Sequence, residues 1–328
     1  MNITYLLEIN FILFLQNIGN WLTPIFQAFT FMGYSTFYII ILPLIYWCID
    51  SSIGLRLSIL FLFSGITNNI LKHIFRMPRP YWVESKIQAL DSDPEFGFPS
   101  GHAQNASSAW GLLASQLWQK ARKFSWLVIV VISLIGFSRI YLGVHFPYQV
   151  IAGSIIGILI LLVFIKFEKK ILSWFNRFSF GYQIGFLFVS SLVLLALMLL
   201  SIYVPSPAPI PITWTENSII AKAAKLPNPF IPKDSIQYSG LWFGLTAGAT
   251  WLWKRSGPFT SHGKISQKIL RYVLGMAITI FLVFGLSKIL PELDTLIGLF
   301  LFYWQSVLVG FWVWGLAPWV FRKMHLAE

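Results

Sequence analysis

Long apolar runs separated by short polar or basic breaks dominate the chain. A helix needs about 20 apolar residues to cross a bilayer, and nine runs approach that length. They cover residues 35–49, 54–71, 101–118, 126–138, 147–165, 184–204, 238–253, 272–290 and 296–321. The pattern predicts an all-α fold: a polytopic integral membrane helical bundle with about nine transmembrane helices.

The first 34 residues follow a different pattern. Polar residues such as Gln16, Asn20 and Gln27 interrupt the apolar ones, and Trp21 is suited to a membrane interface. Glu8 and the lack of a basic start argue against a signal peptide. We therefore expect 1–34 to be an interfacial amphipathic segment, with an additional span as the alternative.

Composition supports a membrane protein. Of the 328 residues 56% are hydrophobic and only 11% are charged, whereas soluble domains carry about 25% charged residues. The net charge of +12 is explained by the positive-inside rule, so nucleic acid is not an expected partner. The single cysteine, Cys48, excludes an intramolecular disulfide, and no metal-ligand pattern occurs.

Basic residues are unevenly divided between the two sides that nine spans define. Fifteen of the 24 lysines and arginines fall on one side, which should be cytoplasmic. The loop before Pro99, the turn at 139–146 and a Pro-rich loop at 205–237 then face outward. We divide the chain into the segment 1–34, a membrane core 35–177 and a C-terminal membrane extension 178–328 of four helices that includes the 205–237 loop.

One outward-facing junction, Pro99-Ser100-Gly101-His102, has the residue types of a helix N-terminus. Pro99 presets the backbone, and Ser100 is a good N-cap residue. Gly101 allows an anion to approach the free N–H groups of the first turn. His102 would then stand beside that anion as a proton donor, although such a sequence is often only a cap.

Two further polar clusters fall on the same predicted side. Lys72 precedes Arg79-Pro80, and Arg139 precedes His145 and Gln149. Arginine offers paired donors to phosphate oxygens and lysine a mobile charge. One histidine could attack phosphorus while the other protonates the leaving oxygen.

Each residue also has a structural interpretation. Lys72 and Arg79 could extend to the interface, Arg139 could pair with a headgroup, and a lone histidine in a turn is often structural. Acidic residues occur in the 84–95 loop but not at the motif positions. We therefore expect three uncompensated cations whose missing partner is an anionic substrate.

The order and spacing of these motifs over 72–149 resemble the type 2 phosphatidic acid phosphatase superfamily. Arg79-Pro80-Tyr81-Trp82, Ser138-Arg139-Ile140-Tyr141 and His145-Phe146-Pro147 are similar to its glucose-6-phosphatase branch in particular. The resemblance implies that helices before about residue 177 form the family core. It assigns no chemical role to the chain after that point.

The resemblance also implies residue roles. His145 would be the nucleophile that forms a phosphohistidine, and His102 the general acid and then the general base. Phosphate would be held by the remaining motif residues: Lys72, Arg79, Ser100, Gly101 and Arg139. Their charges would stabilise the transition state in a partly dehydrated site, and no metal or other cofactor is implied.

Gln149 departs from the pattern, which commonly has Asp four residues after the histidine. A spacing of four on a helix places Gln149 beside His145. Its amide oxygen can accept a hydrogen bond from one ring nitrogen and so fix the tautomer of the imidazole. It supplies no negative charge, which costs about 1 kcal/mol relative to a charge-assisted bond.

These observations favour a membrane phosphatase that hydrolyses a phosphomonoester or a terminal diphosphate, most simply of a lipid, at the outer face of the membrane. That face would be periplasmic or exterior in a bacterium and lumenal in a eukaryote. A sugar-phosphate phosphatase, a catalytically silent lipid-phosphate-binding protein and an anion transporter are the alternatives. For the 205–237 loop a solvated connector is expected, with a lid or partner surface as the alternative.

Overall fold

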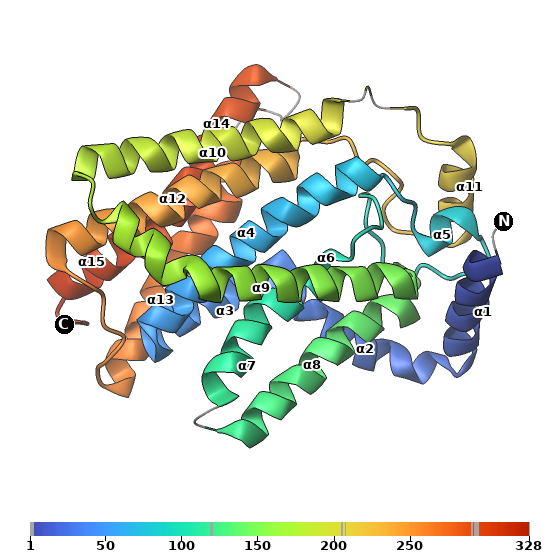
Figure 1. The fold of residues 1–328 in the computed structure, drawn as a ribbon, viewed down its shortest axis with the longest axis horizontal. Helices are drawn as coiled ribbons and strands as arrows, with labels where there is room; N and C mark the ends of the chain where they lie inside the picture. The colour runs from blue at the N-terminus through green and yellow to red at the C-terminus, as the bar shows by residue number, and fades with distance from the viewer. Residues whose placement is uncertain are drawn as a thin grey trace. The chain divides into compact units, whose positions relative to one another are not determined.

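The structure is a computed structural model that describes residues 3–118, 121–204, 206, 208–289, 291 and 295–327. The predicted N-terminal segment, outward loop and eighth span each include residues outside this set, namely 1 and 2, 205 and 207, and 290. Helices dominate the described residues, and no strand occurs among them (Figure 1). The prediction of an all-α membrane protein is confirmed.

Fifteen α-helices are interrupted or joined by short π- and 3-10 turns. They are α1 (Ile3–Asn17), α2 (Thr23–Phe31), α3 (Ser35–Leu44), α4 (Ser51–Phe75), α5 (Pro80–Val83), α6 (Gly101–Asn105), α7 (Gly111–Trp118), α8 (Arg122–Tyr141), α9 (Pro147–Phe175), α10 (Phe180–Tyr203), α11 (Ile212–Ile220), α12 (Lys233–Ser256), α13 (Ile265–Ile280), α14 (Leu296–Phe311) and α15 (Ala317–Lys323).

The described helices include six that are long and apolar enough to cross a membrane. They lie at Ser51–Val83, Arg122–Tyr141, Pro147–Phe175, Phe180–Tyr203, Ile265–Lys288 and Leu296–Lys323. A seventh is possible if Asn20–Phe31 and Ser35–Ile49, which meet at a 53° bend, form one span. The predicted count of nine is therefore not confirmed, because α6–α7 and α12 do not meet these requirements.

Small residues explain why α12 is less apolar than a lipid-facing helix. Gly240, Gly244 and Gly248 recur every four residues and so share one face. A Cβ at Gly244 would lie 2.2 Å from the carbonyl oxygen of Val307 on α14. Close backbone packing on α14, rather than contact with lipid, accounts for this part of the sequence.

Contacts divide the chain into two compact units, each built from separate segments. The first, which we call the site unit, contains the residues up to 37 together with 67–163 and 200–231. The second, the extension unit, contains 38–66, 164–199 and the residues from 232 onward. The predicted three-part division of the chain stays a prediction.

The core of the site unit is formed by residues from distant parts of the sequence. Ile9 and Ile12 of α1 are buried with Tyr81, Trp82 and Phe146 in one hydrophobic cluster. Leu7 and Phe14 on other faces of α1 are exposed. Helix α1 thus packs on the motif region, and its placement in a membrane interface stays a prediction.

Candidate functional site

The site unit contains every residue that the sequence motifs predicted, each at or near a helix end. Lys72 lies in the last turn of α4, and Arg79 immediately precedes α5. Ser100, Gly101 and His102 form the start of α6. Arg139 lies in the last turn of α8, His145 in the following turn, and Gln149 in the first turn of α9.

His145 is oriented by Gln149. The Gln149 amide nitrogen donates to the Pro78 carbonyl at 2.9 Å, and its oxygen accepts from the backbone N–H of Phe146 at 3.2 Å. These contacts fix the amide orientation. The amide oxygen, 3.1 Å from His145 Nδ1, can therefore only accept a hydrogen bond from a protonated Nδ1. The other nitrogen, Nε2, is left with its lone pair.

Arg79 lies against that nitrogen. Its Nη1 atom is 3.2 Å from His145 Nε2 and 3.0 Å from the Val144 carbonyl oxygen. The His145 side chain is almost fully buried. Burial first, and then the charges of Arg79 and Arg139, hold the pKa of His145 well below its usual range. These influences favour the neutral imidazole.

His102 belongs to the same electrostatic environment, because Lys72, Arg79 and Arg139 all act on it as they do on His145. Its ring packs edge to face on Tyr34 at 4.9 Å. The Nε2 atom of His102 is buried without a hydrogen-bond partner among the described residues.

Ser100 occupies the predicted N-cap position, but its hydroxyl makes no capping bond. Instead its backbone N–H donates to the Gln149 carbonyl at 3.0 Å, and its buried Oγ has no partner within the described part of the chain. A Cβ at Gly101 would lie 2.9 Å from Asn68 Oδ1. The missing side chain of Gly101 therefore permits the close approach of Asn68, a contact that the sequence did not predict.

Three carboxylates correct the expectation of uncompensated cations. Asp91 pairs with Arg139 at 2.5 Å, Asp93 pairs with Arg79 at 2.8 Å, and Glu95 pairs with Lys72. We call Lys72, Arg79 and Arg139 the motif cations and residues 91–95 the acidic loop. The prediction failed because it considered charges only at motif positions. The regular spacing of acids two residues apart was the available signal.

Burial differs between the two partners of each pair. The side chains of Lys72, Arg79 and Arg139 are 6%, 0% and 1% exposed, whereas those of Glu95, Asp93 and Asp91 are 23%, 27% and 18% exposed. A buried cation without a counter-charge would be strongly destabilised. The acidic loop supplies that charge from the more exposed side.

The cations also determine the ionisation of the loop. Burial alone would raise the pKa of Asp93, but Arg79 and Lys72 outweigh it and hold the pKa well below its usual range. Burial would likewise raise the pKa of Asp91, and Arg139 with the Tyr34 hydroxyl lowers it below the usual value. Both carboxylates therefore stay ionised at neutral pH.

The predicted connector at 205–237 supports this loop. Its helix α11 packs on α5 (Figure 1), with Asn217 donating to the Trp82 carbonyl at 3.0 Å. Further along, the backbone N–H of Lys225 donates to Ser92 Oγ at 3.0 Å, and that of Asn228 to the Pro94 carbonyl at 2.9 Å. Residues 212–231 are thus a packed part of the site unit, not a solvated connector.

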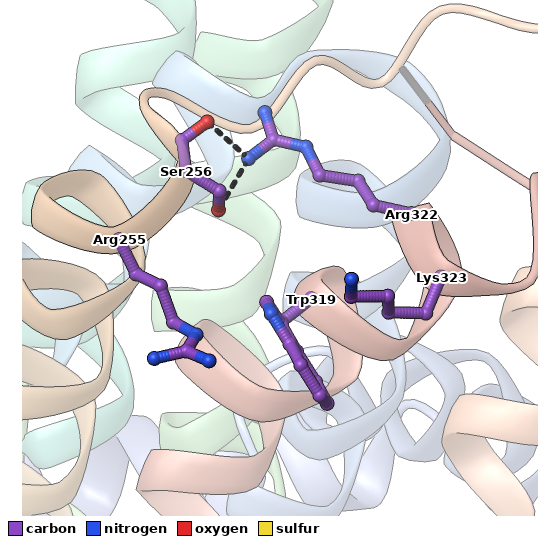
Figure 2. A pocket seen from close by; sticks show the side chains of 5 residues that line it. All are labelled: Arg255, Ser256, Trp319, Arg322 and Lys323. Carbon is purple, nitrogen blue, oxygen red and sulfur yellow. Dashed lines mark hydrogen bonds between the residues drawn. The ribbon is translucent and has the colours of Figure 1, made fainter.

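A second group of cations lies in the extension unit. Figure 2 shows Arg255, Arg322 and Lys323, which we call the α15 cluster, around Trp319 in a cavity of about 480 Å³. Arg322 donates to the carbonyl and hydroxyl of Ser256 at 2.8 and 2.7 Å. The cavity lining contains no histidine and no carboxylate, so it offers no imidazole like the two in the site unit.

No cluster of three or more histidine, cysteine, aspartate or glutamate side chains in the described residues is arranged to hold a metal ion. One further histidine of the site unit, His73, has a structural environment. His73 is buried and contacts the carbonyls of Asn69 and Pro229 at 2.7 and 2.8 Å. Its two ring nitrogens are thus occupied by backbone groups.

Comparison with known proteins supports the motif assignment. Residues 53–173 match the PAP2 superfamily, and residues 236–328 match the transmembrane extension of PAP2 superfamily phosphatases. The chain is 30% identical over 165 residues to phosphatidylglycerophosphatase B of Bacillus subtilis, which covers 46% of this chain and 77% of that protein. The extension of unassigned role thus corresponds to a recognised part of such phosphatases.

Two other relatives match over smaller shares of their own length. Sphingosine-1-phosphate phosphatase 1 of Rattus norvegicus is 33% identical, over 43% of this chain and 34% of that protein. Glucose-6-phosphatase catalytic subunit 1 of Haplochromis nubilus is 32% identical, over 32% and 38%. A solved structure of a transmembrane PAP2-type phosphatidylglycerolphosphate phosphatase from Bacillus subtilis matches with 26% identity and a TM-score of 0.40, over 49% of this chain and 86% of that one.

The match to most of a curated relative and the two family models agree with the motifs and with the apolar helices. The resemblance inferred from sequence is confirmed, as is assignment to the hydrolases of phosphoric esters. This chain belongs to the PAP2 superfamily of integral membrane phosphatases.

Proposed function

We propose that the protein hydrolyses a phosphomonoester or terminal diphosphate of a lipid through a phosphohistidine formed on His145, at the outer face of the membrane. The observation that carries the proposal is the state of the His145 ring. Gln149 fixes its proton on Nδ1, and its unprotonated Nε2 lies 3.2 Å from Arg79 Nη1. A neutral imidazole with its lone pair next to a buried guanidinium is suited to attack an anionic phosphoryl group.

In the first step, the Nε2 lone pair of His145 forms a bond to phosphorus as the bond from phosphorus to the leaving oxygen breaks. Binding of the phosphate anion among the three cations offsets the charges that lower the pKa of His102 and so favours its protonated form, which gives its proton to that oxygen. In the second step, neutral His102 removes a proton from water as the water oxygen attacks phosphorus. The N–P bond then breaks, its electron pair returns to Nε2, and inorganic phosphate is released.

The phosphate would be bound by Lys72, Arg79 and Arg139, with the Ser100 hydroxyl and the Gly101 N–H. Two buried donors without partners among the described residues support this assignment, Ser100 Oγ and Arg139 Nε. Buried polar atoms are ordinarily hydrogen-bonded. A phosphoryl group in this place would satisfy them, and three cations would neutralise its charge.

A lipid substrate is favoured by the membrane setting and by the relatives named for lipid phosphates, phosphatidylglycerophosphatase B and sphingosine-1-phosphate phosphatase 1. A sugar phosphate is the second candidate, because the third motif and the relative named glucose-6-phosphatase favour it. A silent binding protein would retain the phosphate contacts but fail to turn over.

Purified protein in detergent, assayed with phosphatidic acid, phosphatidylglycerophosphate, a sphingoid phosphate, a prenyl diphosphate and glucose 6-phosphate, tests the proposal. We expect phosphate release from at least one lipid and an acid-labile phosphoenzyme on rapid quenching. Release from glucose 6-phosphate alone would select the second candidate. Phosphate binding without release from any of the five compounds would select the silent binding protein.

A further inference from the structure

The acidic loop is arranged as a competitor for the phosphate site. We infer that Asp91, Asp93 and Glu95 form an anionic clamp, which holds the motif cations until a phosphoryl group displaces it. The inference rests on the proposed function, because it takes these cations as the phosphate ligands. It adds a means of controlling access to that site.

The first argument is the one-to-one pairing. Three acids at alternate positions of one short loop engage three cations that come from α4, the start of α5 and the end of α8. Each carboxylate places one oxygen on a cation that a phosphate would need. A permanent structural pair would explain one such contact. Here every cation that is proposed to bind phosphate is paired with a carboxylate of the acidic loop.

The second argument is the donor inventory of Arg79. Its Nε donates to the Glu95 carbonyl at 2.7 Å, and Nη1 and Nη2 donate to the carbonyls of Val144 and Phe96. The two remaining N–H groups face His145 Nε2 and the Asp93 carboxylate. A guanidinium has five N–H groups, so a phosphate oxygen can bind Arg79 only by replacing Asp93 or the ring nitrogen.

The third argument is exposure. The motif cations are buried beneath the loop, whereas the three carboxylates are each about a fifth to a quarter exposed. Water therefore reaches the acids before it reaches the cations. Displacing the carboxylates into solvent restores the hydration that they lack when paired, which offsets part of the lost pairing and makes the exchange with a phosphate feasible.

The loop is held on its other side by the backbone of 221–228. Ala89 N–H donates to the Ala221 carbonyl at 3.0 Å, and Lys225 and Asn228 donate to Ser92 and Pro94. Opening of the clamp therefore involves the segment from 221 to 228. Residues 221–228, which belong to the site unit, would thus help to control access to the phosphate site.

Three isosteric variants test the clamp, namely Asp91→Asn, Asp93→Asn and Glu95→Gln. The probe is inorganic phosphate, whose dissociation constant is measured by equilibrium titration without turnover. If the clamp leaves about a tenth of molecules open, its weakening tightens apparent phosphate binding by up to about tenfold. Glu84→Gln removes a nearby carboxylate that forms no salt bridge with a described residue, and it should leave the constant unchanged.

Unchanged or weaker phosphate binding in all three folded variants would overturn the clamp. Because loss of a buried partner can unfold the protein, a second design locks the loop instead of loosening it. The double variant Ser92→Cys/Lys225→Cys should lose phosphate binding at least tenfold when oxidised and regain it on reduction. Full binding in the oxidised form, with the cross-link verified by mass spectrometry, would also refute the clamp.

The two proposals fail in different ways. If the variants bind phosphate more tightly but no substrate is hydrolysed, the clamp stands and the phosphohistidine function is wrong. If hydrolysis proceeds through His145 but phosphate affinity does not respond to the loop, the function stands and the clamp is wrong.

Discussion

The two groups of cations in this protein differ in burial, and their partners differ with it. Lys72, Arg79 and Arg139 are buried, and each pairs with a carboxylate. Arg255 and Lys323 of the α15 cluster are exposed, and neither makes a salt bridge with any residue that the structure describes. Water stabilises an exposed cation, whereas a buried one needs a counter-charge.

The side chains that surround the motif cations also differ from those that surround the α15 cluster. The motif cations surround two imidazoles, whereas Arg255 and Lys323 lie over the ring of Trp319 at 5.6 and 5.8 Å. A cation over an aromatic face gains a modest attraction but no chemistry. Positive charge alone therefore does not identify the site, and it is the combination of buried cations, paired carboxylates and an oriented histidine that does.

The largest effect is expected from removing the nucleophile. His145→Ala should lower kcat by about 10⁴-fold, because the N–P bond can no longer form. His262→Ala replaces an exposed histidine of the extension unit and should leave the rate unchanged. Initial rates on the best lipid substrate measure both. A His145→Ala enzyme with undiminished phosphate release would assign the nucleophile elsewhere.

The second-largest effect is expected on stability, when the buried guanidinium of Arg79 is replaced. Arg79→Lys keeps the charge but cannot reach three carbonyls, an imidazole and a carboxylate at once. We expect it to destabilise the protein by about 3 kcal/mol, since each buried carbonyl left unpaired costs about 1–3 kcal/mol. Thermal unfolding in detergent measures this. Arg255→Lys in the exposed cluster is the matched control, and equal unfolding temperatures for the two variants would contradict the distinction.

A smaller effect is expected on the pH profile. Because the pKa of His145 is lowered, the ring stays neutral below pH 6.5, and the acidic limb of kcat/KM should lie below that value. Asp93 raises this pKa, so Asp93→Asn should move the limb to still lower pH. Gln149→Glu places a negative charge at Nδ1, favours the imidazolium and should move the limb upward. Profiles of kcat/KM against pH would show both shifts. If the two variants and the unaltered protein gave the same profile, the acidic limb would not report the ionisation of His145.

The motifs were predictable because their geometry is local. A spacing of four residues at the start of α9 is enough to bring Gln149 to His145. The family resemblance then supplied roles that spacing alone could not. The same local reasoning located Lys72, Arg79 and Arg139 at helix ends.

The clamp and the number of spans were not predictable in the same way. Asp91, Asp93 and Glu95 lie in an irregular loop, so which cation each acid meets is decided by tertiary packing. The 221–228 segment reaches that loop from more than a hundred residues away in sequence. The apolar run at 238–253 predicted a membrane span, but α12 does not meet the requirements for one, and its glycines pack on α14.

The smallest effect is expected from the α15 cluster. The double variant Arg255→Gln/Lys323→Gln removes two exposed charges that touch neither imidazole and pair with no carboxylate of the described chain. Surface charges of this kind contribute at most about 1 kcal/mol. The rate of hydrolysis should therefore change less than about twofold, and the unfolding temperature by only a few degrees. Rates on one lipid phosphate at low and at high salt are the measurement. A tenfold loss of kcat would mean that exposed cations support the chemistry after all, and burial with a paired carboxylate would then cease to distinguish the site.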